Sequence, residues 1–194
     1  MSDADHQRLA PGFLVAPPPL SDPNFDHSVV LLTSHESSGS MGFIINKPSS
    51  LHLHALLEDL DITPTVADRV VLVGGPLKAS SGFVMYEHEA RKPNGPGIEV
   101  SPTISISPSL DVLEQACSGK LSGRFELLLG YAEWAPNQLN AELERGDWLQ
   151  ADLDPELLFD VVVAKRWDEV WARLGVNPFE IGRASCRERV LTDV

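Results

Sequence analysis

The hydrophobic and polar positions of the chain form short apolar runs that are separated by turn residues. Apolar and β-branched residues fill 28–33 and 41–46, and a polar Ser/Gly loop joins these two runs. This pattern predicts a hairpin of two buried strands, and Pro48 is expected to end the second one, since proline cannot donate to a sheet ladder. Similar runs predict strands at 12–16, 70–73, 82–86, 103–107, 124–129 and 148–151.

Apolar residues recur at helical spacing in other segments. Leu53, Leu56, Leu57 and Leu60 share one face of a helix predicted over 51–60. Further helices are predicted where an apolar stripe is followed by a glycine or preceded by a proline, which are common stop and start signals. These segments are 110–116, 136–146, 155–159 and 166–174.

The order of these elements predicts the fold class. Strands dominate the first half, helices are scattered between hairpins, and no regular alternation of strand and helix is present. We therefore predict an α+β protein with peripheral helices, rather than a doubly wound parallel sheet. No internal repeat or linker precedes residue 180, so one domain is expected.

Composition narrows the classes of partner. The chain has 194 residues, of which 43% are hydrophobic, a formal net charge of −13 and a pI of about 4.7. Such a surface repels a phosphate backbone, and no basic stripe appears before residue 180, so nucleic acid is not the expected partner. The acidic stretch 133–160 indicates a solvated face or a docking face for a basic partner.

Cysteine and histidine usage points to a reduced compartment and away from metal binding. The two cysteines, Cys117 and Cys186, show no zinc-type spacing. His52 and His54 could share a strand face, but no third ligand is spaced to join them, so we predict surface histidines, no metal and no cofactor. The N-terminus lacks signal-peptide features and no apolar run reaches the ~20 residues that span a bilayer. A cytoplasmic protein without a membrane segment is predicted.

The C-terminal segment 180–194 differs from the rest of the chain. It contains EIGRASCRERV, in which three arginines and a cysteine follow an acidic chain. The string resembles a translated sequencing adapter, and we interpret it as a tail outside the domain 1–179. Codons unlike the adapter at 180–190 would contradict this hypothesis.

Two turns are candidate ligand sites. Gly74, Gly75 and Pro76 follow the predicted strand 70–73, where glycines can turn backbone N–H groups toward an anion or simply permit a sharp bend. Asn46 and Lys47 precede a proline and can form either a local cap or a polar lip beside a ligand.

The stretch GYAEWAPNQLNAEL, at 130–143, raises the same choice between a site and a structural joint. Tyr131, Trp134, Gln138 and Glu142 are the candidate ligand-binding residues here, and none is predicted to be catalytic. On the joint interpretation, Trp134 is buried at a strand-to-helix corner with its indole N–H on a backbone acceptor. Glu142 is then exposed and pairs with Arg145.

Several motifs resemble the YqgE/AlgH family of bacterial proteins, which are labelled transcriptional regulators without an established activity. The matching pieces are PGFLVAPPPLSDPNFDHSVVLL, GSMGFIINKP, VLVGGPL, GYAEWAPNQLNAELERGDW and LLFDVVVAKRW, in order across 9–179. The resemblance implies a compact α+β fold with a barrel-like mixed sheet at its centre.

The junction departs from the family pattern at three positions. Glu133 and Asn137 stand where the family has glycine, and Asn140 stands where it has a glutamate. An amide cannot act as a general base, so the substitution at Asn140 favours a structural joint over a catalytic one.

Three classes of function remain. The first, which we favour, is a non-enzymatic binding or regulatory protein, monomeric or a small homo-oligomer, that acts through a protein partner or a small ligand. The second is a regulator that binds DNA directly, which the charge opposes. The third is an enzyme with a pocket near Asn46, Gly74, Gly75 and Trp134, although no common catalytic motif is present.

Overall fold

A computed structural model describes residues 9–18, 22–90 and 96–178, and the tail 180–194 lies outside them. The described strands form a mixed sheet of ten, in the order β10-β1-β2-β3-β9-β6-β8-β7, to which β4 and β5 are attached through β9. The strands are β1 (Gly12–Val15), β2 (Val29–Glu36), β3 (Gly39–Ile44), β4 (Pro48–His52), β5 (Val70–Val73), β6 (Leu77–Glu87), β7 (Ile98–Ser101), β8 (Ile104–Ser107), β9 (Phe125–Trp134) and β10 (Leu149–Asp152).

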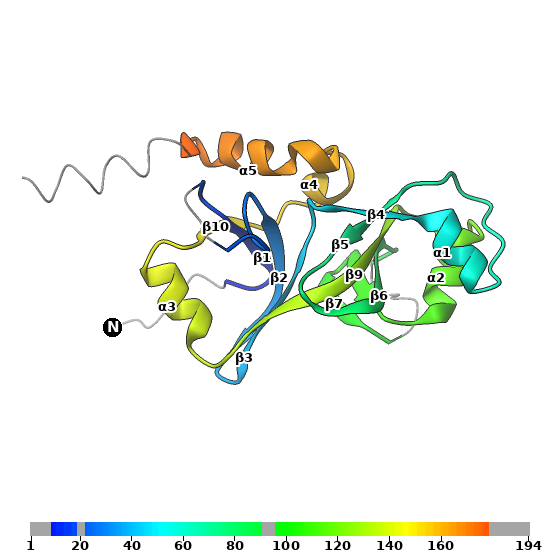
Figure 1. The fold of residues 1–194 in the computed structure, drawn as a ribbon, viewed down its shortest axis with the longest axis horizontal. Coiled ribbons are helices and arrows are strands. Elements are labelled where there is room, and N and C mark those ends of the chain that lie inside the picture. Colours follow the sequence, from blue (N-terminus) through cyan, green and yellow to red (C-terminus); the bar gives the residue numbers. More distant parts are fainter. Residues whose placement is uncertain (1–8, 19–21, 91–95, 179–194) are drawn as a thin grey trace, which may run out of the picture.

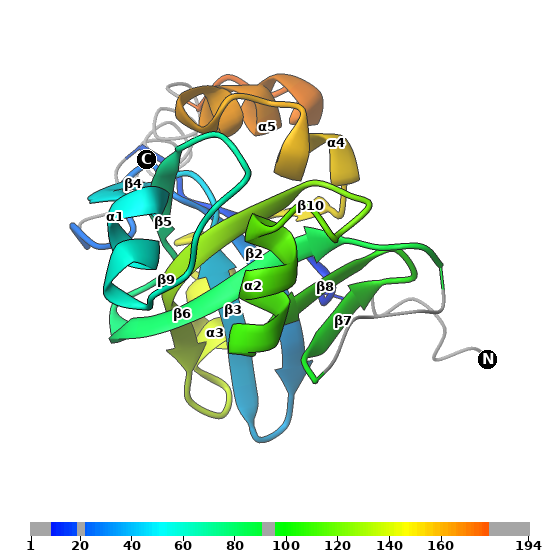
Figure 2. The ribbon, with the colours of Figure 1, turned by 90° about the vertical axis from the view of Figure 1, so that its right-hand side faces the viewer.

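Five α-helices and one 3₁₀ turn connect the described strands. They are α1 (Leu53–Asp59), α2 (Leu110–Cys117), α3 (Gln138–Glu144), α4 (Pro155–Phe159), η1 (Val163–Lys165) and α5 (Arg166–Leu174). In Figure 1, α3 lies at the end of the molecule that holds β1 and β10, and α1 and α2 lie at the opposite end. The other view places α4 and α5 above the sheet, with α1 and α2 in front of β6 and β9 (Figure 2).

Strand alternation builds the core on both faces of the sheet. Phe13 and Val15 of β1 enter a cluster with α4 and α5, whereas Leu14 packs into a second cluster with α3. A third cluster joins β6 and β9 to α1 and α2. The fold is therefore α+β, as predicted, and the bent sheet is barrel-like around the first cluster without closing, since β10 and β7 stay at its ends.

Gly130 divides the long strand β9 into two halves that pack differently. Its φ of 73° is a left-handed conformation, and an added Cβ would lie 2.5 Å from the carbonyl oxygen of Gly75. The side chain that packs into the first cluster is Leu128 before this glycine and Tyr131 after it, so the even positions give way to odd ones. The strand serves different partners along its length: β5 pairs with it before Gly130, β3 pairs with it after Gly130, and the β6 pairing continues across Gly130 with an irregular register between Leu77 and Gly82 of β6.

Arg166 fixes α5 to the sheet from inside the core. This side chain is almost fully buried, and its guanidinium donates to the backbone oxygens of Ile45, Leu158 and Val161. It also forms two hydrogen bonds with the carboxylate of Glu126, one of them 2.9 Å long. A buried guanidinium needs this full set of acceptors, because an unpaired buried charge is strongly destabilising.

Most predicted elements are present, and the differences have local causes. Strand β3 ends at Ile44, and Pro48 begins the edge strand β4, where its missing N–H is tolerated. Strand β9 extends to Trp134 instead of ending at residue 129, because residues 132–134 pair with β3. Pro136 lies in a turn rather than at the first helical position, and Asn137 caps α3 with a φ of 63°. The strand β7 is not among the predicted strands.

Candidate functional site

The junction after β9 is closed by its own hydrogen bonds. The indole N–H groups of Trp134 and Trp148 both donate to Oε2 of Glu142, at 2.8 and 2.9 Å. Gln138 donates to Oε1 of the same carboxylate at 2.9 Å and accepts from the backbone N–H of Ala135 at 3.0 Å. Glu142 is thus the common acceptor that ties α3 to the sheet.

This geometry differs from the expected one in two respects. The acceptor of the Trp134 indole is a carboxylate, not a backbone oxygen, and Arg145 pairs with Asp147 rather than with Glu142. A second tryptophan, Trp148, packs edge-on against Trp134 with ring centroids 5.9 Å apart. The polar groups that could have faced a ligand are engaged within the joint.

The glycines after β5 are explained by close backbone packing. A Cβ on Gly75 would lie 2.1 Å from the carbonyl carbon of Tyr131, and one on Gly74 would lie 2.4 Å from the oxygen of Gly130. The Gly74 N–H donates to Leu129 and its oxygen accepts from Ile44, so neither group is directed toward an anion. Pro76 is exposed and directly precedes β6.

Asn46 and Lys47 line an open hollow of about 440 Å³. The Asn46 amide bridges the N–H of Val29 and the oxygen of His27, each at 2.8 Å. The Lys47 ammonium donates to the oxygen of Asn24 at 2.7 Å, and burial lowers the pKa of this lysine. Both side chains therefore hold the preceding loop, and the hollow's lining does not include Gly74, Gly75 or Trp134.

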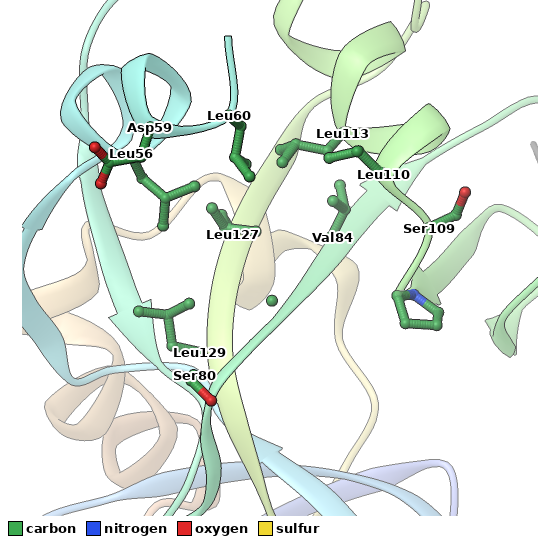
Figure 3. A pocket seen from close by; sticks show the side chains of 12 residues that line it. Leu56, Asp59, Leu60, Ser80, Val84, Ser109, Leu110, Leu113, Leu127 and Leu129 are labelled. Carbon is green, nitrogen blue, oxygen red and sulfur yellow. The ribbon is translucent and has the colours of Figure 1, made fainter. Parts of the chain in front are cut away.

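A different region leaves its apolar side chains uncovered. Between α1 and α2, a strip of the sheet face formed by β6 and β9 is open to solvent as a groove of about 270 Å³ (Figure 3). Half of its lining residues are leucines, and Figure 3 shows these side chains converging from both helices and β9. The leucines are Leu56, Leu60, Leu110, Leu113, Leu127 and Leu129; the other lining residues are Asp59, Ser80, Gly82, Val84, Pro108 and Ser109.

Gly82 keeps the floor of this groove open. A Cβ on Gly82 would meet only the Cδ1 atom of Leu127, at the ordinary contact distance of 3.6 Å, and its φ lies outside the left-handed range. Neither backbone conformation nor packing requires glycine here, in contrast to Gly75. Any side chain larger than alanine at this position would project into the groove.

The helices expose leucine at the two rims. Leu60 and Leu110 retain 42% and 49% of their accessible surface, although each continues a stripe whose other members, such as Leu57 and Leu113, are buried. Sequence periodicity revealed the stripes of 51–60 and 110–116 but not the gap between them. The gap depends on how far apart the two short helices lie on the sheet.

Two titratable groups at this end of the molecule, Cys117 and Asp68, serve the fold. Cys117 is buried at the C-terminal end of α2, and burial raises the pKa of its thiol, which makes it a poor nucleophile. The Asp68 carboxylate accepts from the His54 backbone N–H and from His52 at 3.0 Å, and these bonds lower its pKa. Within the described ranges, no three His, Cys, Asp or Glu side chains are grouped as a metal site requires. None of the described helices is long and apolar enough to cross a membrane.

Taken together, the open bent sheet, the peripheral helices and the leucine-lined groove define a single-domain α+β protein with a surface recess suited to binding. Residues 13–179 match the family described as AlgH-like, and the chain belongs to this family. Among its relatives, a UPF0301 protein of Anaeromyxobacter sp. (strain K) is 36% identical over 177 residues, which cover 88% of this chain and 90% of the relative. The UPF0301 protein YE3428 of Yersinia enterocolitica is 37% identical over 176 residues, covering 87% and 93%.

Two solved structures share the fold. The solution structure of the AlgH protein from Pseudomonas aeruginosa has a TM-score of 0.73 at 34% identity, and the match covers 95% of this chain and 97% of that one. The crystal structure of protein DIP2367 from Corynebacterium diphtheriae has a TM-score of 0.67 at 25% identity, with 89% and 90% covered. The names of these relatives state no activity.

Proposed function

We propose that the protein is a non-catalytic, cytoplasmic binding protein whose groove between α1 and α2 receives apolar side chains of a protein partner. The observation that carries this proposal is the exposure of Leu60 and Leu110 beside an open, leucine-lined recess. Apolar surface in contact with water is unfavourable by about 25 cal/mol per Å², so a partner that covers it gains that free energy.

The size of the groove favours protein side chains over a whole small molecule. Its volume of about 270 Å³ is below the roughly 300–1,000 Å³ of typical ligand pockets. One or two leucine-sized side chains of a partner fit such a volume, whereas a cofactor would extend beyond it. A small apolar ligand is the alternative occupant of the same groove.

The groove offers little to an enzyme. The polar lining consists of the Asp59 carboxylate and the hydroxyls of Ser80 and Ser109; the described lining includes no histidine, cysteine or lysine. Nucleophilic catalysis needs a base within hydrogen-bond reach of the nucleophile, and acid–base catalysis needs a group with a matched pKa. These requirements support binding rather than turnover.

Direct DNA binding receives equally little support. The groove is flanked by an acidic side chain, and the whole chain carries a net charge of −13. Affinity for a phosphate backbone comes from lysine and arginine that displace counterions. The regulatory role that the family's label of transcriptional regulator suggests would therefore be exerted through a protein partner.

The test is affinity capture from a bacterial extract with matched baits. Leu110→Ser alters the groove, whereas Leu51→Ser alters a leucine of similar exposure, 46%, that lies outside the lining. We expect at least one protein to be retained by the parent and by Leu51→Ser and to be lost from Leu110→Ser. Retention that is equal on all three baits would contradict the proposal.

A further inference from the structure

Of the four leucines that α1, α2 and the residue after α1 contribute to the groove, three are followed by an acidic residue. The pairs are Leu60–Asp61, Leu110–Asp111 and Leu113–Glu114. Successive residues of a helix or its terminal turn point in different directions, so the leucines line the groove while the acids line a neighbouring hollow. The apolar and the acidic recesses therefore share the walls formed by α1 and α2.

The acidic hollow is open and its carboxylates are available. It has a volume of about 510 Å³, and its charged lining comprises Asp61, Asp111, Glu114 and Lys120. None of the three acids forms a salt bridge with a described residue. With Asp59 in the groove, four acids and one base line the two recesses.

We infer that the partner presents a short segment in which an apolar side chain enters the groove and a nearby lysine or arginine enters the acidic hollow. This inference rests on the proposed function and adds the chemistry of the partner. Charge complementarity across an interface accelerates association and excludes partners of the wrong charge. For the same reason a second copy of this chain, with a net charge of −13, is a poor occupant.

A peptide library displayed on phage and selected on the full chain tests the inference directly. We expect enriched peptides to combine Leu, Ile, Met or Phe with a Lys or Arg within about four positions, since helical neighbours lie three and four residues apart. Enrichment of acidic or uncharged peptides, or no enrichment above a blank surface, would overturn the inference.

Matched variants then assign the charge to the hollow. For a synthetic peptide from the selection, Asp111→Asn combined with Glu114→Gln should weaken Kd about 2- to 30-fold, the range expected for two exposed ion pairs. Glu133→Gln combined with Glu144→Gln makes the same change in net charge at exposed positions outside both recesses and should leave Kd unchanged. Equal weakening by both double variants would refute a local acidic subsite.

The groove variant separates failure of this inference from failure of the proposed function. Leu110→Ser should weaken binding of the same peptide about tenfold or more, as expected for an anchor contact. Peptides that depend on Leu110 but carry no basic residue would refute the inference and leave the groove as a binding site. Peptides that ignore both Leu110 and the two acids would refute the inference, and matching results in affinity capture would refute the proposed function as well.

Discussion

Two regions of β9, one on either side of Gly130, differ in how completely their side chains are packed. In the joint after Gly130, Trp134 is buried, and the Glu142 carboxylate accepts from two indoles and one amide. In the groove before it, Leu127 and Leu129 lie beneath a gap whose rims expose Leu60 and Leu110. Aromatic and acidic residues alone do not indicate a site; the groove is the better candidate because its packing is incomplete.

The largest effect is expected from removing the central ring of the joint. Trp134→Ala should lower the free energy of unfolding by about 3–5 kcal/mol, because it leaves a cavity at a side chain that is 3% exposed. It also removes one donor from Glu142. Chemical denaturation measures the change, and a midpoint equal to that of the parent would show that the joint is not closely packed.

Gly75 lies against the strand that leads to the joint and Gly82 lies in the groove, and alanine at these two positions should change stability in opposite directions. The larger change is expected at Gly75. Gly75→Ala should destabilise the fold by about 1–3 kcal/mol, since the new methyl group would overlap the backbone of Tyr131. The same denaturation experiment measures it. An unchanged unfolding free energy would mean that the backbones of β9 and this turn separate easily, and would reopen the turn as a ligand site.

Neutralising the acceptor of the joint should have an intermediate effect. Glu142→Gln keeps the shape but replaces one carboxylate oxygen by an amide that donates, so one indole or amide donor loses its acceptor. We expect a loss of about 1–2 kcal/mol. Glu144→Gln, on the same helix but exposed, is the control and should change stability by less than about 0.5 kcal/mol. Equal effects of the two variants would contradict a structural role for Glu142.

The smallest effect is expected at the floor of the groove, and it has the opposite sign. Gly82→Ala should stabilise the protein by about 0.4–1 kcal/mol, because alanine fits the backbone there and reduces the entropy of the unfolded chain. Thermal unfolding beside the parent gives the difference. A clear loss of stability would show that glycine at this position serves the fold, and would weaken the case for a groove that is kept open.

The sequence by itself determined the fold class and most of its elements. The apolar runs that became β1, β2, β3, β5 and β8 follow directly from β-branched and apolar residues between turns, and the stripe of α5 follows from helical spacing. The quoted motifs also determined the family, which the match over 13–179 shows. Local preferences suffice for these features because each depends on neighbouring residues.

Only the tertiary structure decided which candidates face solvent. The sequence predicts that Glu142 is exposed and pairs with Arg145, yet its carboxylate accepts a hydrogen bond from the indole N–H of Trp148, which follows α3. The sequence does not show which glycine is required by packing, but a Cβ on Gly75 would overlap the backbone of Tyr131, whereas one on Gly82 would meet only the tip of Leu127. The groove exists because α1 and α2, short helices separated by some fifty residues of chain, are held apart on the sheet; such a distance is set by long-range packing and not by local preference.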